Sequence, residues 1–194
     1  YFKVFQHLSS KIKVDVIENY VTDDEMFRKY ETNSAPRWVL DRAMRYIEKN
    51  DLKDEDDLWF VIDKDRWIDS QIRELASYCD KYANWHLVIS NPCFEVWLYF
   101  HKKADIKSSI SVSCNDFKKE ISSFEKGGYH PLNFIPDFQK AITNAKANDS
   151  DVNHFMPNVN ETKVYQLGEA ILDQVHNTDI IEFINVTIPR LIKS

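Results

Sequence analysis

A run of five apolar residues that ends at an aspartate is the feature that most constrains how this chain can fold. The run is Leu58-Trp59-Phe60-Val61-Ile62, and Asp63 follows it. It is too short for a buried helix and has no polar face, which predicts a strand covered on both sides. Strands of this kind belong to parallel sheets that carry helices on both faces. Trp85–Ser90 is a second short apolar run, and Asn91-Pro92 stops it.

Helical patterns alternate with short strands through residue 101. Helices are predicted at residues 1–11, 34–50, 69–79 and 93–101, with Ser34 and Asp69-Ser70 as caps, and strands at 13–17, 58–63 and 85–90. This alternation predicts an α/β fold with crossover connections and a mostly parallel sheet flanked by helices. With only 3 glycines, the chain offers few hairpin turns. An edge strand is expected in residues that precede Tyr1 in the natural protein.

The second half of the chain has a different character. Helices are predicted at residues 116–125, 136–146, 163–176 and 178–192, and Gly127–Pro131 is typical of a loop. We therefore predict an α/β domain over residues 1–104 and a mostly helical region over residues 105–194 that packs on it.

Charge and cysteine content limit the possible partners and the compartment. The formal net charge is −6, so nucleic acid would be bound only through a local basic patch or bridging metal ions. The 3 cysteines include no CxxC pair, and their odd number without a signal sequence fits the reducing cytoplasm. No apolar run approaches the length of a membrane span.

Asp63 and Asp65 are the strongest candidates for chemistry. They leave the carboxyl end of the predicted strand, which is where ligands bind in open parallel sheets. Both carboxylates can reach a hard cation such as Mg²⁺, which would bind phosphate oxygens and stabilise charge in phosphoryl transfer. The alternative is a pair of solvated turn residues or a helix cap. Lys64, between them, is either a phosphate contact or a surface lysine.

The segment from Asn91 to His101, which follows the second predicted strand, contains three further candidate site residues. Glu95 stands in the first turn of an apolar helix, where it either faces the same crevice as Asp63 or stabilises the helix end. Asn91 either supports the site by hydrogen bonding or belongs to an ordinary turn. His101, in the last turn, either contacts substrate or interacts favourably with the helix dipole. Cys93 is interpreted as a small core residue rather than a nucleophile.

Two polar segments complete the set. Asn160 and Thr162 lie before a predicted helix, and they either cap it or belong to a loop that returns to the active site. Lys102, Lys103 and Lys107 form either a basic rim for nucleic acid or a solvated face.

Three segments together resemble the RloB-like family over nearly the whole chain. The most specific is Ile89-Ser90-Asn91-Pro92-Cys93-Phe94-Glu95-Val96-Trp97-Leu98-Tyr99-Phe100-His101, which is similar to the hallmark of that family. Leu58–Asp65 resembles the family's strand that ends in D-x-D. Asn158–Leu167 resembles its C-terminal N-P-x-T-x-V-x-x-L segment, with Val159 where the family usually has proline.

The resemblance implies a toprim-like domain. The family includes the abortive-infection component AbiLii, and its members are regarded as phage-defence proteins that are often encoded beside an ATPase partner. Toprim domains bind Mg²⁺ through acidic residues, here matched by Asp63 and Asp65, and cut or join nucleic-acid strands. The family's E-G-x-x-T-E motif, which carries the usual general acid/base glutamate, is expected just upstream of Tyr1.

Two main hypotheses about function follow. The first is a nuclease dependent on Mg²⁺ or Mn²⁺ that acts in phage defence on DNA or on an RNA such as tRNA. The second is a catalytically incomplete toprim scaffold or regulatory subunit that docks on an ATPase. A small-molecule phosphotransfer enzyme is a weaker third, because the chain has no P-loop. The sequence does not specify the oligomeric state.

Overall fold

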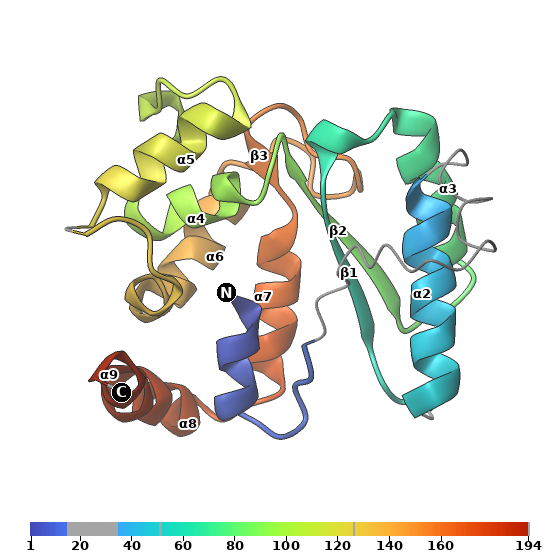
Figure 1. Ribbon diagram of the computed structural model, residues 1–194, viewed down its shortest axis with the longest axis horizontal. Helices are drawn as coiled ribbons and strands as arrows, with labels where there is room; N and C mark the ends of the chain where they lie inside the picture. Colours follow the sequence, from blue (N-terminus) through green and yellow to red (C-terminus); the bar gives the residue numbers. More distant parts are fainter. Residues whose placement is uncertain (15–34, 51, 126, 194) are drawn as a thin grey trace, which may run out of the picture. The chain divides into compact units, whose positions relative to one another are not determined.

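The computed structural model describes residues 1–14, 35–50, 52–125 and 127–193 (Figure 1). The chain divides into two compact units. The first unit contains residues 1–15, 61–65 and 88–194, and the second contains residues 16–60 and 66–87. A division of the chain at residue 104 stays a prediction. None of the described helices is long and apolar enough to cross a membrane.

The sheet within the described residues has three strands in the order β1-β2-β3 and is mostly parallel. Strands β1 (Leu58–Asp63) and β2 (Trp85–Asn91) are the two apolar runs that the sequence predicts. β3 (Glu161–Thr162) runs antiparallel to β2, with Thr162 opposite Ser90 and Glu161 opposite Asn91. Our expectation of a polar turn at this position was therefore incomplete, because the turn contains a two-residue strand.

The two apolar strands differ in burial. In β2, the consecutive residues Val88, Ile89 and Ser90 are all 0% exposed, which confirms a strand covered on both faces. In β1, only Phe60 is buried, and Val61 is 37% exposed. The prediction that β1 is covered on both sides is therefore wrong, because its face that carries Val61 is exposed while the face that carries Phe60 is buried.

The second unit contains two helices that pack side by side, α2 (Ala35–Asn50) and α3 (Asp69–Cys79) (Figure 1). Helix α3 buries Ile72, Leu75 and Cys79, as its helical spacing predicts. Its N-cap is Ile68, whose N–H donates to Gln71 Oε1 at 3.3 Å, so the predicted cap at Asp69-Ser70 is wrong by one residue. The predicted cap at Ser34 lies outside the described residues.

The N-terminal segment differs from its prediction. Residues 1–11 were expected to be one helix, but only η1 (Phe2–His7) is helical, and it is a 3-10 helix. The predicted strand at 13–17 is irregular at residues 13 and 14, and its remaining residues lie outside the described part.

Helix α4 (Glu95–Lys102) lies at the centre of the first unit, and its residues Val96–His101 are all buried. A helix that is apolar on all sides must be covered on all sides. Its neighbours are α5 (Cys114–Ser123), α6 (Phe138–Ala147) and β3, and α7 (Val164–Asp173) packs on α6 (Figure 1). Short 3-10 turns lie between these helices, namely η3 (Ile106–Ser108), η4 (Pro131–Asn133) and η5 (Ile135–Asp137). A further 3-10 turn, η2 (Lys64–Arg66), follows β1.

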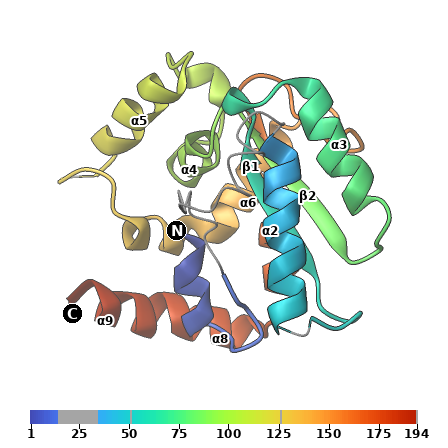
Figure 2. The same ribbon diagram turned by 45° about the vertical axis from the view of Figure 1, so that its right-hand side comes forward.

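The chain ends in a helical rod that the sequence predicts as one helix at residues 178–192. It consists of α8 (Asn177–Glu182), the π-helical turn η6 (Phe183–Thr187) and α9 (Ile188–Lys193), which follow one another without a break (Figure 2). Phe183 packs on Phe5 of η1 with ring centroids 5.8 Å apart.

Candidate functional site

The acidic pair lies where β1 ends. Asp63 is the last residue of the strand, and Lys64 and Asp65 lie in the turn η2. The backbone N–H of Asp65 donates to the carbonyl oxygen of Pro92 at 2.9 Å. This bond joins the end of β1 to the segment that follows β2, so the structure brings together the two strand ends that carry the candidate residues.

A thiol holds the side chain of Asp65. The Cys114 Sγ donates to Asp65 Oδ2 at 3.2 Å, and the Cys93 thiol lies close to both Cys114 and Glu95. Asp65, Cys114, Cys93 and Glu95 therefore form a continuous chain of contacts, which we call the thiol–carboxylate cluster. It gathers residues from η2, from the start of α4 and from the start of α5.

The environment of this cluster keeps its thiols protonated. Burial, followed by the contacts with Cys114 and Glu95, raises the pKa of the Cys93 thiol. Partial burial, together with the hydrogen bond to Asp65 and the charges of Asp65 and Asp63, raises the pKa of the Cys114 thiol. Because a protonated thiol is a poor nucleophile, both cysteines serve as hydrogen-bond donors at neutral pH. Cys93 is 2% exposed, which agrees with its interpretation as a core residue.

The segment from Pro157 to Lys163 is hydrogen-bonded to the end of β2, and we call it the strap. Its backbone donates from Asn160 N–H to the Asn91 oxygen at 2.7 Å and from Lys163 N–H to the Ile89 oxygen at 2.8 Å. Asn91 in turn donates from Nδ2 to the Pro157 oxygen at 3.0 Å. The strap therefore returns to the end of β2. This position is compatible with the alternative in which Asn160 and Thr162 belong to a loop near the candidate site.

Asn160 has two unusual features within the strap. Its φ is 66°, in the left-handed region that Asn adopts more readily than most residues. Its Oδ1 is buried and has no hydrogen-bond partner in the part of the chain that the structure describes. A buried acceptor of this kind is rare in native proteins.

Two of the predicted site residues lie inside the core. His101 is 0% exposed, and its Nδ1 donates to the Trp97 oxygen at 3.1 Å while Nε2 accepts from the Tyr1 hydroxyl at 2.5 Å. Burial lowers the pKa of His101 to about 3, so the ring is neutral. Thr162 is also 0% exposed; its Oγ1 bonds to Ser90 Oγ at 2.7 Å and accepts from the first N–H of α7 at 3.2 Å. The structure therefore gives both side chains internal partners.

The lysines after α4 differ from one another. Lys102 Nζ bonds to Glu125 Oε1 at 2.7 Å and to Asp137 Oδ2 at 2.9 Å, so this lysine ties α4 to the segments beside it. Lys103 and Lys107 are exposed. The basic-rim interpretation therefore applies to Lys103 and Lys107 alone.

The donor atoms at the β1 end suit a hard cation. No group of three His, Cys, Asp or Glu side chains within the described ranges is arranged to hold a metal ion. Mg²⁺ often takes only one or two protein carboxylates and completes its shell with water and phosphate oxygens. The Asp63 and Asp65 carboxylates are a donor set of this chemistry, whereas the protonated thiols beside them are not ligands.

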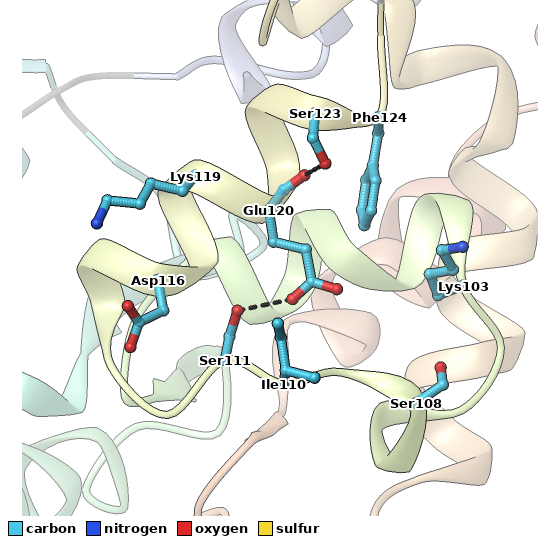
Figure 3. A pocket seen from close by; sticks show the side chains of 9 residues that line it. All are labelled: Lys103, Ser108, Ile110, Ser111, Asp116, Lys119, Glu120, Ser123 and Phe124. Atoms are coloured by element: carbon cyan, nitrogen blue, oxygen red, sulfur yellow. Dashed lines mark hydrogen bonds between the residues drawn. The ribbon is translucent and has the colours of Figure 1, made fainter.

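A separate pocket of about 550 Å³ lies along α5 (Figure 3). Lys103, Lys119 and Glu120 contribute to its lining, and Glu120 Oε2 accepts from the Ser111 hydroxyl at 2.7 Å. Apart from Lys103, none of the predicted site residues lines it. Its mixed charges indicate no particular class of ligand.

The sequence analysis did not identify Cys114 as part of the site. Cys114 lies 49 residues after Asp65, and nothing in the local pattern around it indicates that they meet. The one available signal was its position directly after Ser113, a good N-cap residue, which places a cysteine at the start of a helix.

Comparison with known proteins agrees with the motifs. The family model for RloB-like proteins matches residues 1–171 of this chain. No curated protein and no solved structure matches it. Because the family match extends over most of the 194 residues and includes all three motif segments, the chain belongs to the RloB-like protein family.

Proposed function

We propose that this chain is a metal-dependent nuclease-like effector of a bacterial phage-defence system, of the abortive-infection kind, that acts on phosphodiesters of DNA or RNA. One observation carries the proposal: the Asp63–Asp65 turn and the Asn91–Glu95 segment meet at the carboxyl edge of the sheet through the Asp65 N–H to Pro92 bond. Ligand sites in α/β sheets lie at this edge. The RloB-like membership of the chain adds support.

In this proposal Asp63 and Asp65 hold Mg²⁺ or Mn²⁺. The bound cation supplies Lewis-acid stabilisation of charge on phosphate oxygens. It also reconciles a net charge of −6 with a polyanionic substrate, because the cation bridges two groups of the same sign.

The remaining residues have supporting roles. Glu95, whose carboxylate contacts the Cys93 thiol, is the candidate for proton transfer. Asn91 fixes the strap, and the buried Oδ1 of Asn160 is an acceptor for a donor group of the substrate. Lys64, in the same turn as Asp65, is the candidate phosphate contact. An ATPase partner belongs to the same proposal and follows from the family resemblance.

The test combines cleavage with direct measurement of metal binding. The full chain, alone and with a co-expressed ATPase, is incubated with DNA and with total tRNA in Mg²⁺ or Mn²⁺. Mn²⁺ binding is measured separately from the electron paramagnetic resonance signal of the free ion. Asp63→Asn and Asp65→Asn keep the side-chain shape and remove the charge. Asp173→Asn, at an exposed residue that ends α7, is the matched control.

We expect metal-dependent cleavage and Mn²⁺ binding in the wild type and the Asp173 variant, and loss of cleavage with weaker but measurable Mn²⁺ binding in the other two. Cleavage that persists in Asp63→Asn and Asp65→Asn would refute the proposal. A protein that neither cuts nor binds Mn²⁺ would instead support the scaffold alternative, in which the toprim-like unit docks on an ATPase.

A further inference from the structure

We infer that Cys114 is a positioning residue of the proposed metal site, and that its thiol fixes the orientation of the Asp65 carboxylate. The observation is the hydrogen bond from Cys114 Sγ to Asp65 Oδ2 at 3.2 Å. The inference rests on the proposed function and adds to it a contribution from the C-terminal half of the chain, which none of the sequence motifs indicated.

Asp65 needs such support because of where it lies. It is an exposed residue in the three-residue turn η2, and the bond to Pro92 fixes its backbone but not its carboxylate. Among the described residues, the Cys114 thiol is the hydrogen-bond donor to that carboxylate. Groups that hydrogen-bond a ligating carboxylate set its orientation, and their loss weakens metal binding even though they never touch the ion.

The thiol itself is held firmly by helix α5. Cys114 is the first residue of the helix, directly after the N-cap Ser113, whose Oγ accepts from the Asp116 N–H at 3.3 Å. The helix is anchored by Phe117, which is 0% exposed and packs edge-on against Tyr99 of α4 with ring centroids 6.2 Å apart. The position of the Sγ atom therefore follows from the packing of α5 on α4 rather than from a mobile loop.

A second contact of the Cys114 thiol, with Cys93, agrees with a positioning role. Cys114 also lies close to the Cys93 thiol, which in turn lies close to Glu95. A carboxylate held by a donor on a packed helix is more nearly fixed in its binding orientation than a free one.

The experiment measures Mn²⁺ affinity in the full chain, with no need for activity. Cys114→Ala removes the donor, whereas Cys114→Ser keeps one. We expect Mn²⁺ affinity to fall about three- to tenfold in Cys114→Ala and to stay within about twofold of the wild type in Cys114→Ser. Cys79→Ala, at a buried cysteine of α3, is the control for loss of a thiol elsewhere, and its Mn²⁺ affinity is expected to match the wild type.

A double variant separates positioning from a general structural effect. In Asp65→Asn the carboxylate is already gone, so adding Cys114→Ala should cause no further loss of Mn²⁺ affinity. Equal affinity of Cys114→Ala and the wild type, no recovery in Cys114→Ser, or an additional loss in the double variant would each overturn the inference while the proposed function stands. A wild type that binds no Mn²⁺ and cuts nothing would overturn both.

Discussion

Replacing Lys163 by Met is expected to destabilise the first unit strongly. The ammonium group of Lys163 bonds to both carboxylate oxygens of Asp149, at 2.7 and 2.6 Å, and to the Asp151 carbonyl oxygen at 2.6 Å. The Tyr165 hydroxyl donates to the same carboxylate at 2.6 Å. The side chains of the ion pair are each only 1% exposed. Met has a similar volume, so the substitution removes the charge and leaves the packing nearly intact.

The expected cost follows from what the substitution leaves behind. Asp149 would keep its charge in a buried site with only two neutral donors, the Tyr165 hydroxyl and the Asp151 N–H, and removing one partner of a buried ion pair typically costs about 3–5 kcal/mol. For a chain of 194 residues, this loss corresponds to a fall in melting temperature of roughly 10 °C. Because the total stability of a domain is only about 5–15 kcal/mol, the effect is large but measurable.

The assay is urea unfolding followed by circular dichroism, with matched variants. Lys146→Met is the control, because Lys146 Nζ lies 2.6 Å from Glu169 Oε1 but the two side chains are 54% and 38% exposed. An exposed pair of this kind contributes about 0–1 kcal/mol. The double variant Lys163→Met/Asp149→Leu removes both charges and is expected to recover most of the loss.

Equal losses of unfolding free energy in Lys163→Met and Lys146→Met would refute this prediction, because burial would then not set the contribution of an ion pair to stability. A double variant that is no more stable than Lys163→Met would also refute it, since the loss would then come from packing rather than from an unpaired buried charge. Because the Lys163 N–H also bonds to the Ile89 oxygen, a genuine loss should loosen the strap, seen as faster amide hydrogen exchange at Asn160.

Three further predictions concern the same unit. Burial lowers the pKa of His101 from 6.5 to about 3. Between pH 6.5 and about pH 3, the imidazole is therefore protonated in the unfolded chain and neutral in the folded chain. The unfolding free energy should therefore fall by about 1.4 kcal/mol per pH unit as the pH decreases through that window, and His101→Gln should remove this slope in urea titrations at pH 7, 6 and 5. Thr162→Val leaves the Ser90 hydroxyl and the first N–H of α7 without their partner, and thermal unfolding should show a loss of about 1–3 kcal/mol. Gly168→Ala would place a Cβ 2.7 Å from Cγ1 of Ile142, and the resulting overpacking should exceed the gain in helix propensity by about 1 kcal/mol; a melting temperature higher than that of the wild type would contradict this.

Elements with a local signal could be predicted from the amino-acid sequence. Two short apolar runs were enough to place β1 and β2, because a run of five or six residues is typical of a strand and too short for a buried helix. The spacing of Ile72, Leu75 and Cys79 was enough for α3, because the buried face of a helix follows from its own periodicity. The end of β1 also made Asp63 and Asp65 candidate site residues, since the carboxyl edge of a sheet is defined by the direction of the strand; their role stays a prediction.

Contacts between residues that are distant in the sequence depend on how the elements pack. β3 has just two residues and exists because β2 offers it a partner, so no local pattern could predict it. Lysine is almost never fully buried, and Lys163 is buried only because packing brings it against Asp149. The contact of Cys114 with Asp65 likewise depends on how α5 packs against α4. Hydrogen bonds and ion pairs form between neighbours in space, and neither short-range periodicity nor composition records that proximity.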